Sequence, residues 1–227
     1  MVVIQCTAAL LGKIKKYVEI EDLEALRKSD DAIGSITDFF AWHANLHPFD
    51  QAHSRYTDSN TIPGFKSIRN SIVLTHNVSQ APAFIIAARA ATYKNFAEEV
   101  KRALAMTLLM YDATEDFVRE YLKEPLRFTR TGTRQQLGLH KEIAQSVQWA
   151  APDFVRECGG SLDALPKVMT AHMFKFIVGG KDYHMLGERM QQGLKELNGL
   201  LPQVDPWEER QKRQQREEME TNENGQA

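Results

Sequence analysis

The hydrophobic pattern changes its period near residue 95, and this change constrains the fold more than any other feature of the sequence. Residues 40–47 alternate between Phe40, Trp42, Ala44 and Leu46 on one side and Ala41, His43, Asn45 and His47 on the other. From Asn95 to Tyr111, apolar residues instead recur every three or four positions. A period of two is typical of a half-buried strand and a period near 3.6 of an amphipathic helix. The chain must therefore pack helices against a sheet.

The same criteria predict the other elements along the chain. We expect strands at residues 2–6, 40–47, 70–77, 81–88 and 126–131, with the third and fourth forming a hairpin. We expect helices at residues 7–17, 95–111, 115–124, 134–150, 162–178 and 185–201. The predicted fold class is α+β: a mainly antiparallel sheet with helices packed on one face, followed by a C-terminal helical extension. The predicted division is 1–150 for the α+β domain, 151–204 for the extension and 205–227 for a polar, mobile tail.

Composition and charge exclude several classes of protein. The 227 residues are 43% hydrophobic, which is enough for a sizeable core. A formal net charge of −2 gives no indication of nucleic-acid binding. Cys6 and Cys158 are far apart, so neither a disulfide framework nor a thiolate zinc site is expected, and no cofactor is implied. The first residues lack the order of a signal peptide, and no apolar run is long enough to span a membrane, so we predict a cytoplasmic protein.

The segment WHANLHPFD contains the first candidate site. On a strand, His43 and His47 would be roughly 13 Å apart, too far to share a metal ion, so no metal site is predicted. His43 and Asn45 would share a face, and His76 in the segment LTHN would lie on another strand. Histidine beside asparagine suits acid–base or oxyanion chemistry. The alternative is that these side chains only line the more polar face of a strand.

The second candidate is the segment RFTRTGTRQQLG. Arg130 and Arg134 flank a Thr-Gly-Thr turn, and Thr133 is placed to cap the helix that follows. A helix N-terminus carries free N–H groups and a partial positive charge, and arginine binds phosphate or carboxylate through two hydrogen bonds. We therefore predict an anion-binding site of Arg130, Thr133 and Arg134. The alternative is that Thr133 only caps the helix and the arginines are solvated.

Four segments resemble a small bacterial family of unknown function, over roughly residues 1–150. They are IQCTAALLGKI, WHANL with the motif W-[HY]-A-N-L, IVLTHN, and TRTGTRQQLG with the motif T-x-x-R-x-x-L-G. Where this family continues with S-M-N-D after Leu-Gly, the present chain reads LHKEIAQ. The resemblance implies a fold and a site location, and no activity.

Two classes of function follow from these observations. The first is an intracellular accessory protein of bacteria, phages or plasmids, acting as a binding or regulatory module. It would hold a protein partner, or a second copy of itself, through its sheet edge or its carboxy-terminal helices, and a small anionic ligand is also compatible with it. The second is a hydrolase or transferase that acts on a phosphate- or carboxylate-bearing substrate. It would use His43 or His76 as acid and base, Asn45 as a polarising group, and Arg130 with Arg134 as an anion clamp. An enzyme of this kind requires these side chains to converge on one site.

Overall fold

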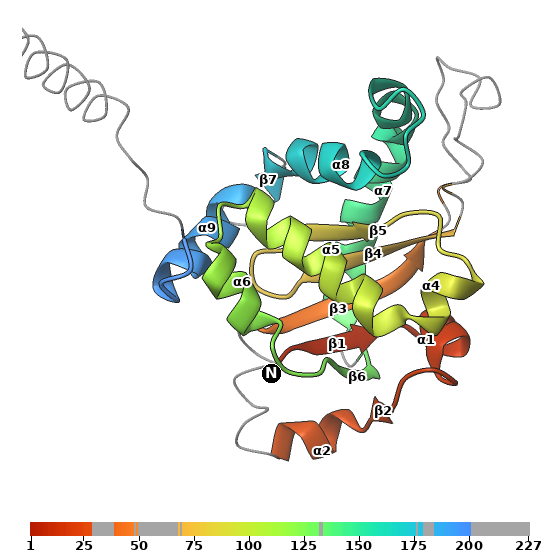
Figure 1. The fold of residues 1–227 in the computed structure, drawn as a ribbon, viewed down its shortest axis with the longest axis vertical. Helices are drawn as coiled ribbons and strands as arrows, with labels where there is room; N and C mark the ends of the chain where they lie inside the picture. The colour runs from red at the N-terminus through yellow and green to blue at the C-terminus, as the bar shows by residue number, and fades with distance from the viewer. Residues whose placement is uncertain are drawn as a thin grey trace, which may run out of the picture.

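A six-stranded mixed sheet forms the centre of the protein in the computed structural model, which describes residues 1–28, 39–47, 49, 68, 70–131, 134–175, 177–178 and 184–200 (Figure 1). The strands are β1 (Val3–Cys6), β2 (Ile20–Glu21), β3 (Ala41–His47), β4 (Ser71–His76), β5 (Pro82–Ile85) and β6 (Arg127–Arg130). Their order across the sheet is β2-β6-β1-β3-β4-β5. A separate pair, β7 (Ile177–Val178) and β8 (His184–Met185), is antiparallel.

The prediction of a mainly antiparallel sheet is wrong. β1 pairs in parallel with both β3 and β6, and β2 pairs in parallel with β6. Only β3–β4 and β4–β5 are antiparallel, as predicted for the hairpin. The long connections that parallel neighbours require carry helices, which makes the arrangement α/β. The fold differs from the predicted one in how the strands pair.

The predicted strand positions themselves are confirmed for β1, β3, β4, β5 and β6.

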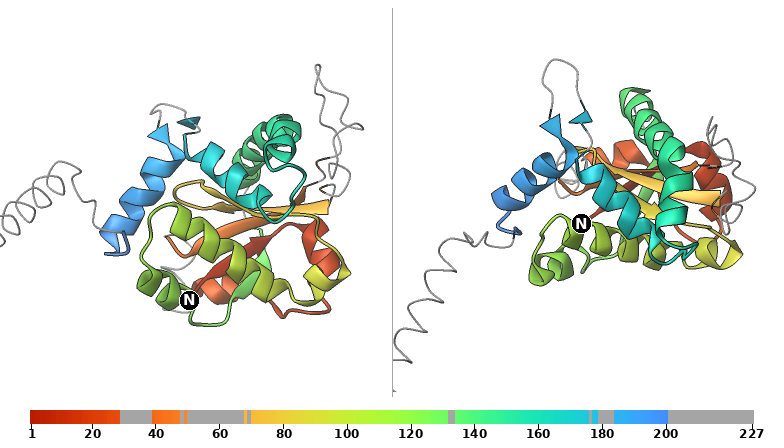
Figure 2. Two further views of the ribbon diagram at one scale, coloured as in Figure 1. Left: turned by 45° about the horizontal axis from the view of Figure 1, so that its top comes forward. Right: turned by 90° about the horizontal axis from the view of Figure 1, so that it is seen from above.

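Helices cover both faces of the sheet, so the prediction of helices on one face is also wrong (Figure 2). On the first face, α1 (Ala8–Ile14), α5 (Phe96–Met110), α6 (Glu115–Tyr121) and α9 (Leu186–Glu196) contribute to one core with Ile4, Trp42 and Leu74. On the second face, α7 (Arg134–Glu157) and α8 (Leu165–Phe174) form another core with Val73 and Phe84. The short helix α2 (Leu23–Lys28) packs on the second face through Leu26 and Val3, and α4 (Ala90–Lys94) precedes α5.

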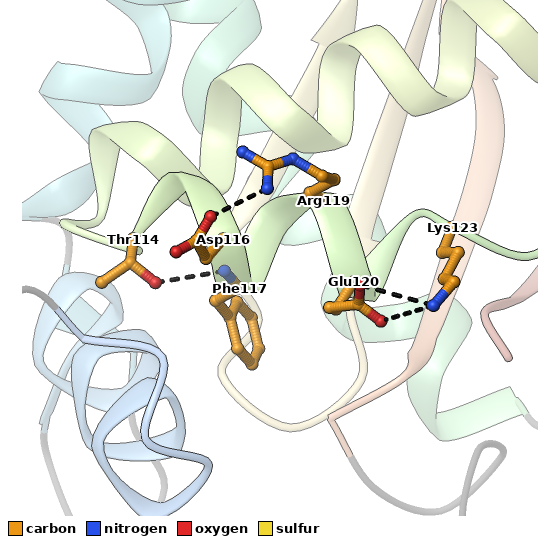
Figure 3. A network of polar contacts seen from close by, with 6 residues as sticks. All are labelled: Thr114, Asp116, Phe117, Arg119, Glu120 and Lys123. Carbon is orange, nitrogen blue, oxygen red and sulfur yellow. Dashed lines mark hydrogen bonds and ion pairs between the residues drawn. The ribbon is translucent and has the colours of Figure 1, made fainter.

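Local side-chain interactions stabilise the helices, and two of the predicted helices are confirmed. Thr114 caps α6, because its side chain accepts a hydrogen bond of 3.1 Å from the backbone N–H of Phe117 (Figure 3). The exposed pair Asp116 and Arg119 on the same helix forms an i,i+3 ion pair of 2.9 Å, of the kind that contributes little to stability. The helix predicted from residue 95 is α5, and the one predicted within residues 185–201 is α9.

The region around residue 150 is continuous helix. α7 runs from Arg134 to Glu157 and includes Pro152. The predicted domain boundary at residue 150 falls within this helix, and the division of the chain stays a prediction. α8 and α9 bury Met169, Met173, Met190 and Leu194 against the sheet and its other helices. The predicted tail, 205–227, lies outside the described residues.

The β5 edge of the sheet is closed by helices. α5 and α8 both pack against β5, and they also pack against each other. Tyr111 at the end of α5 stacks on Phe174 of α8 with ring centroids 5.3 Å apart. Pro82 is the first residue of β5, and proline is tolerated at an edge because it has no N–H to donate. Closing an edge in this way prevents pairing with strands of other molecules.

Gly193 in α9 allows a close approach between this helix and the core. A Cβ atom at this position would overlap the ring of Phe39, which is buried and packs edge-on against His76 at 4.5 Å. We expect Gly193→Ala to lower the free energy of unfolding by about 1–3 kcal/mol, the usual cost of overpacking. The matched control is Gly12→Ala in α1, where an added Cβ meets nothing within 4 Å.

Urea unfolding of both glycine variants provides the measurement. Gly12→Ala is expected to leave stability unchanged or to raise it by up to about 1 kcal/mol, because alanine has the higher helix propensity. If both variants gain stability equally, α9 does not approach Phe39 as closely as the structure indicates.

Candidate functional site at the carboxyl ends of the parallel strands

Three neighbouring parallel strands share a polar-X-polar pattern, which lies at the ends of β6 and β1 and in the middle of β3. The segments are Thr129-Arg130-Thr131, Gln5-Cys6-Thr7 and His43-Ala44-Asn45. Gln5 is in register with His43 on one side and with Thr129 on the other. The six polar residues therefore form two rows of three across the sheet, which we call the polar grid: an inner row of Thr129, Gln5 and His43 and an outer row of Thr131, Thr7 and Asn45.

The polar grid lies on the second face of the sheet, the face that α7 covers. Strand alternation places the grid residues opposite Cys6 and Ala44, which belong to the core of the first face. The inner row is buried, with relative exposures between 0 and 4% for its three residues. The outer row is half-buried. A molecule approaching from solvent would consequently meet the outer row first.

Hydrogen bonds tie the outer row to the strands. The Thr7 hydroxyl donates to Asn45 Oδ1 at 2.7 Å, and the Thr7 N–H donates to the Ala44 carbonyl at 3.0 Å. Because Oδ1 accepts from Thr7, the amide N–H groups of Asn45 are directed away from that hydroxyl. The Thr131 hydroxyl donates to the carbonyl of Gln5 at 3.2 Å and lies 3.5 Å from His43 Nδ1.

Thr129 in the inner row is a buried polar group without a partner. Its side chain is fully buried, and Oγ1 makes no hydrogen bond to any of the described residues. An unpaired buried hydroxyl costs roughly 1–3 kcal/mol of stability. Buried polar groups in native proteins normally have a hydrogen-bond partner. A polar molecule bound at the grid would provide one for Thr129.

The helices that follow β1 and β6 leave the sheet in opposite directions. α1 follows β1 and packs on the first face, whereas α7 follows β6 and packs on the second face. β1 and β6 are adjacent and parallel. In open α/β sheets, ligands bind outside the carboxyl ends of the strands at such a point of divergence. The N-terminus of α7, a helix of 24 residues, begins three positions after Thr131.

The structure brings together some of the residues predicted from sequence. His43 and Asn45 both belong to the polar grid, one in each row. Arg130 is the middle residue of its segment, is exposed, and points to the opposite face from Thr129 and Thr131. Arg134 is the first residue of α7, but its side chain is outside the described part of the chain, as is Thr133. Arg127 forms an ion pair of 2.9 Å with Glu21 across β2 and β6.

His76 is separated from the other predicted residues. It is in register with Trp42 and therefore lies on the first face, opposite His43. Its Nε2 donates to the Phe39 carbonyl at 2.9 Å, and its Nδ1 accepts from the hydroxyl of Ser79 at 2.8 Å. Burial lowers the pKa of His76 from 6.5 to about 4, so the ring is neutral at neutral pH. These contacts stabilise the turn between β4 and β5.

Two hollows in the described surface lie away from the grid. One, of about 640 Å³, is lined by Met110, Phe154 and the α8 residues Lys167, His172 and Lys175, among others. The second, of about 380 Å³, lies between β5, α5 and the start of α8. Neither contains a residue of the polar grid.

Within the described residues, no cluster of three or more histidine, cysteine, aspartate or glutamate side chains is arranged to hold a metal ion. His43 and His47 are both on β3, four residues apart, and Nε2 of His47 lies 3.1 Å from Oε1 of Gln148. None of the described helices has the length and apolar character needed to cross a membrane.

Sequence reasoning missed four residues of the grid: Gln5, Thr7, Thr129 and Thr131. The available signal was the repetition of polar-X-polar at the ends of β1 and β6 and in the middle of β3. Each instance alone is too short to be diagnostic. Only the parallel register of β6, β1 and β3 places the three instances side by side.

The fold and the grid together define an α/β protein with a polar site at the carboxyl ends of its parallel strands. The chain belongs to the family described as "Domain of unknown function (DUF6933)", whose model matches residues 67–196. The matched range includes β4, β5, β6 and the helices from α4 to α9, whereas β1 and β3 precede it. A domain of unknown function is thereby confirmed over residues 67–196, whereas the predicted range of 1–150 and the bacterial origin stay predictions. No curated protein and no solved structure matches the chain.

Proposed function

We propose that this protein is a binding module for a small anionic ligand, held at the carboxyl ends of β6, β1 and β3. The observation that carries the proposal is the divergence of α1 and α7 from adjacent parallel strands, directly beside the polar grid. The six grid residues include no carboxylate that would repel an anion. The positive end of the α7 dipole favours negative charge at the same place.

A further observation supports an anion. Thr129 holds a buried hydroxyl that no described group satisfies. An anion with several oxygen atoms accepts hydrogen bonds from hydroxyl, amide and backbone N–H donors at once. The hydroxyl of Thr129 and the amide of Asn45 supply the first two kinds of donor, and the start of α7 supplies the third.

Stabilisation by phosphate tests this proposal. A ligand that binds only the folded state raises the free energy of unfolding by RT ln(1 + [L]/Kd), about 2.7 kcal/mol at a concentration ~100-fold above Kd. We expect phosphate to raise the melting temperature of the wild type in this way. Sodium chloride at matched ionic strength is the control, because it screens charge without occupying the site.

Two pairs of variants locate the response. Thr129→Val, which removes the unpaired hydroxyl, is expected to lose most of the stabilisation by phosphate, whereas Arg130→Ala, on the opposite face of the sheet, is expected to keep it. Thr170→Val in α8 and Arg119→Ala in α6 are their matched controls, since Thr170 is a buried threonine and Arg119 an exposed arginine, both on other elements. The controls should respond like the wild type. Equal stabilisation of the wild type by phosphate and chloride, or equal responses in all four variants, would rule out an anion site at the grid.

A hydrolase or transferase acting on a phosphate- or carboxylate-bearing substrate is the second candidate. It is favoured by the position of His43, the one titratable residue of the grid, 3.5 Å from the Thr131 hydroxyl. His76 lies on the other face and cannot act on the same bound molecule. Turnover of a phosphomonoester such as p-nitrophenyl phosphate, lost in His43→Gln, would favour this candidate over a binding module.

A protein partner or self-association through the carboxy-terminal helices stays a prediction. The apolar faces of α8 and α9 are buried within the chain, so a partner would contact their outward faces. An accessory role in bacteria, phages or plasmids and a cytoplasmic location also stay predictions from the sequence.

A further inference from the structure

We infer that the ligand of the polar grid is a polyhydroxylated anion about the size of one sugar ring, such as a sugar phosphate or a sugar acid. This inference rests on the anion-binding function proposed above and names the class of ligand. It follows from the dimensions of the grid, from its hydrogen-bonding groups and from the kinds of side chain that it lacks.

The grid is larger than an inorganic anion. It spans three neighbouring strands, which are separated by about 4.8 Å each, so its three columns extend over about 10 Å. Its two rows are two residues apart, or about 7 Å along the strands. An anion bound beside α7 and β6 would contact the column of Thr131. The columns of Thr7 and Asn45 would then be available to the body of a larger ligand.

The chemistry of the outer row fits hydroxyl groups. Thr131 and Thr7 each carry a hydroxyl that donates one hydrogen bond and accepts others. Asn45 is oriented by the 2.7 Å hydrogen bond from Thr7, and its two amide N–H donors have no partner among the described residues. A ligand hydroxyl both donates and accepts, so it can accept from Asn45 and donate to a threonine oxygen. All three groups are uncharged and therefore suit a polar, uncharged body attached to the anion.

The grid has no platform for an aromatic base. Its half-buried row contains two threonines and one asparagine, and its only ring, the imidazole of His43, is buried in the inner row. Recognition of nucleobases commonly uses stacking on exposed aromatic or arginine side chains. We therefore expect a base to add nothing to the affinity for a sugar phosphate.

Isothermal titration calorimetry of the full chain tests the inference. The probes are ribose 5-phosphate, gluconate, AMP, inorganic phosphate and ribose. We expect ribose 5-phosphate or gluconate to bind at least tenfold more tightly than inorganic phosphate. Whichever of the two binds more tightly shows whether the site prefers a phosphate or a carboxylate group. AMP is expected to bind no more tightly than ribose 5-phosphate.

Asn45→Leu removes the oriented amide but keeps the branched shape of the side chain, and we expect it to reduce the affinity for the polyhydroxylated anion to that of inorganic phosphate. Thr7→Val is a second variant in case the first fails to fold, because it leaves the amide in place without its orienting hydroxyl. Thr170→Val is again the control and should bind like the wild type.

The outcomes separate the two proposals. If inorganic phosphate binds at the grid and neither ribose 5-phosphate nor gluconate binds more tightly, the inference is overturned and the anion site stands. A much tighter binding of AMP would also overturn it, in favour of a nucleotide. If ribose binds as tightly as ribose 5-phosphate, or if no anion binds, the anion-binding function itself fails.

Discussion

Trp42→Ala is expected to lower the free energy of unfolding by about 3–5 kcal/mol, the range for removing a large aromatic side chain from a core. Trp42 is fully buried on β3, and its ring lies 4.9 Å from that of His76. Its Nε1 donates to the hydroxyl of Tyr121 at 2.9 Å, and that hydroxyl donates to the Phe39 carbonyl at 2.6 Å. The substitution therefore creates a cavity and removes one member of a buried hydrogen-bond network.

The matched control on the same strand is His47→Ala. His47 is half-buried on the second face and contacts Gln148 and Phe49. We expect His47→Ala to lower the free energy of unfolding by less than about 1 kcal/mol, as for most substitutions outside the core. Chemical denaturation of both variants gives the comparison. Equal and small effects at both positions would show that β3 does not present Trp42 to the core.

A loss of stability in mild acid is the second large effect, and it comes from His76. The pKa of this ring is lowered to about 4 by burial, against 6.5 for the free side chain. Between these two pH values the unfolded chain binds a proton that the folded protein does not, so stability falls as the pH falls from 6.5 to 4. The difference of the two pKa values corresponds to a loss of about 3 kcal/mol by pH 4.

His76→Gln separates this effect from other titrations. The variant is expected to be less stable at neutral pH, because it disrupts the contacts with Ser79 and the Phe39 carbonyl. Its stability should depend much less on pH between 6.5 and 4 than that of the wild type. His172→Gln, an exposed position in α8, is the control and should keep the wild-type dependence. If His76→Gln and the wild type lose stability in parallel, His76 is not the group that titrates.

The positions of most strands and helices follow from the sequence, because the spacing of apolar residues reports which positions face a core. The pairing of the strands does not follow in the same way. β1 and β6 are four residues long and about 120 positions apart in the chain, and nothing local in either one specifies a parallel neighbour. The prediction relied instead on the β4–β5 hairpin, which is local and antiparallel, and extended that geometry to the whole sheet.

The incorrect prediction of helices on a single face arose because several polar residues of the strands are buried. Alternation in β3 was interpreted as one core face and one solvated face, which led to helices on a single face. In the structure, His43 and Thr75 on the second face are buried at 4% exposure, and Ser71 is fully buried. A sheet with both faces covered normally has strands that are apolar throughout. Here the polar positions are instead grouped in one region beneath α7.

Only part of the candidate site could be predicted from the sequence. His43 and Asn45 were identified because they interrupt an apolar strand, and Arg130 because it precedes a helix start. Gln5 and Thr129 were not, since each is a single polar residue in a short strand. His76 was grouped with His43 by residue type, and only the register of β3 with β4 places them on opposite faces.

The most direct test of an anion site at the polar grid is a two-dimensional ¹⁵N–¹H NMR titration of the full chain with phosphate, with sodium chloride as the reference. We expect saturable shifts of backbone amides at residues 5–7, 43–45 and 129–131, and of the side-chain amide of Asn45. Shifts confined to the basic hollow around Lys167, His172 and Lys175, or shifts that chloride reproduces, would contradict it.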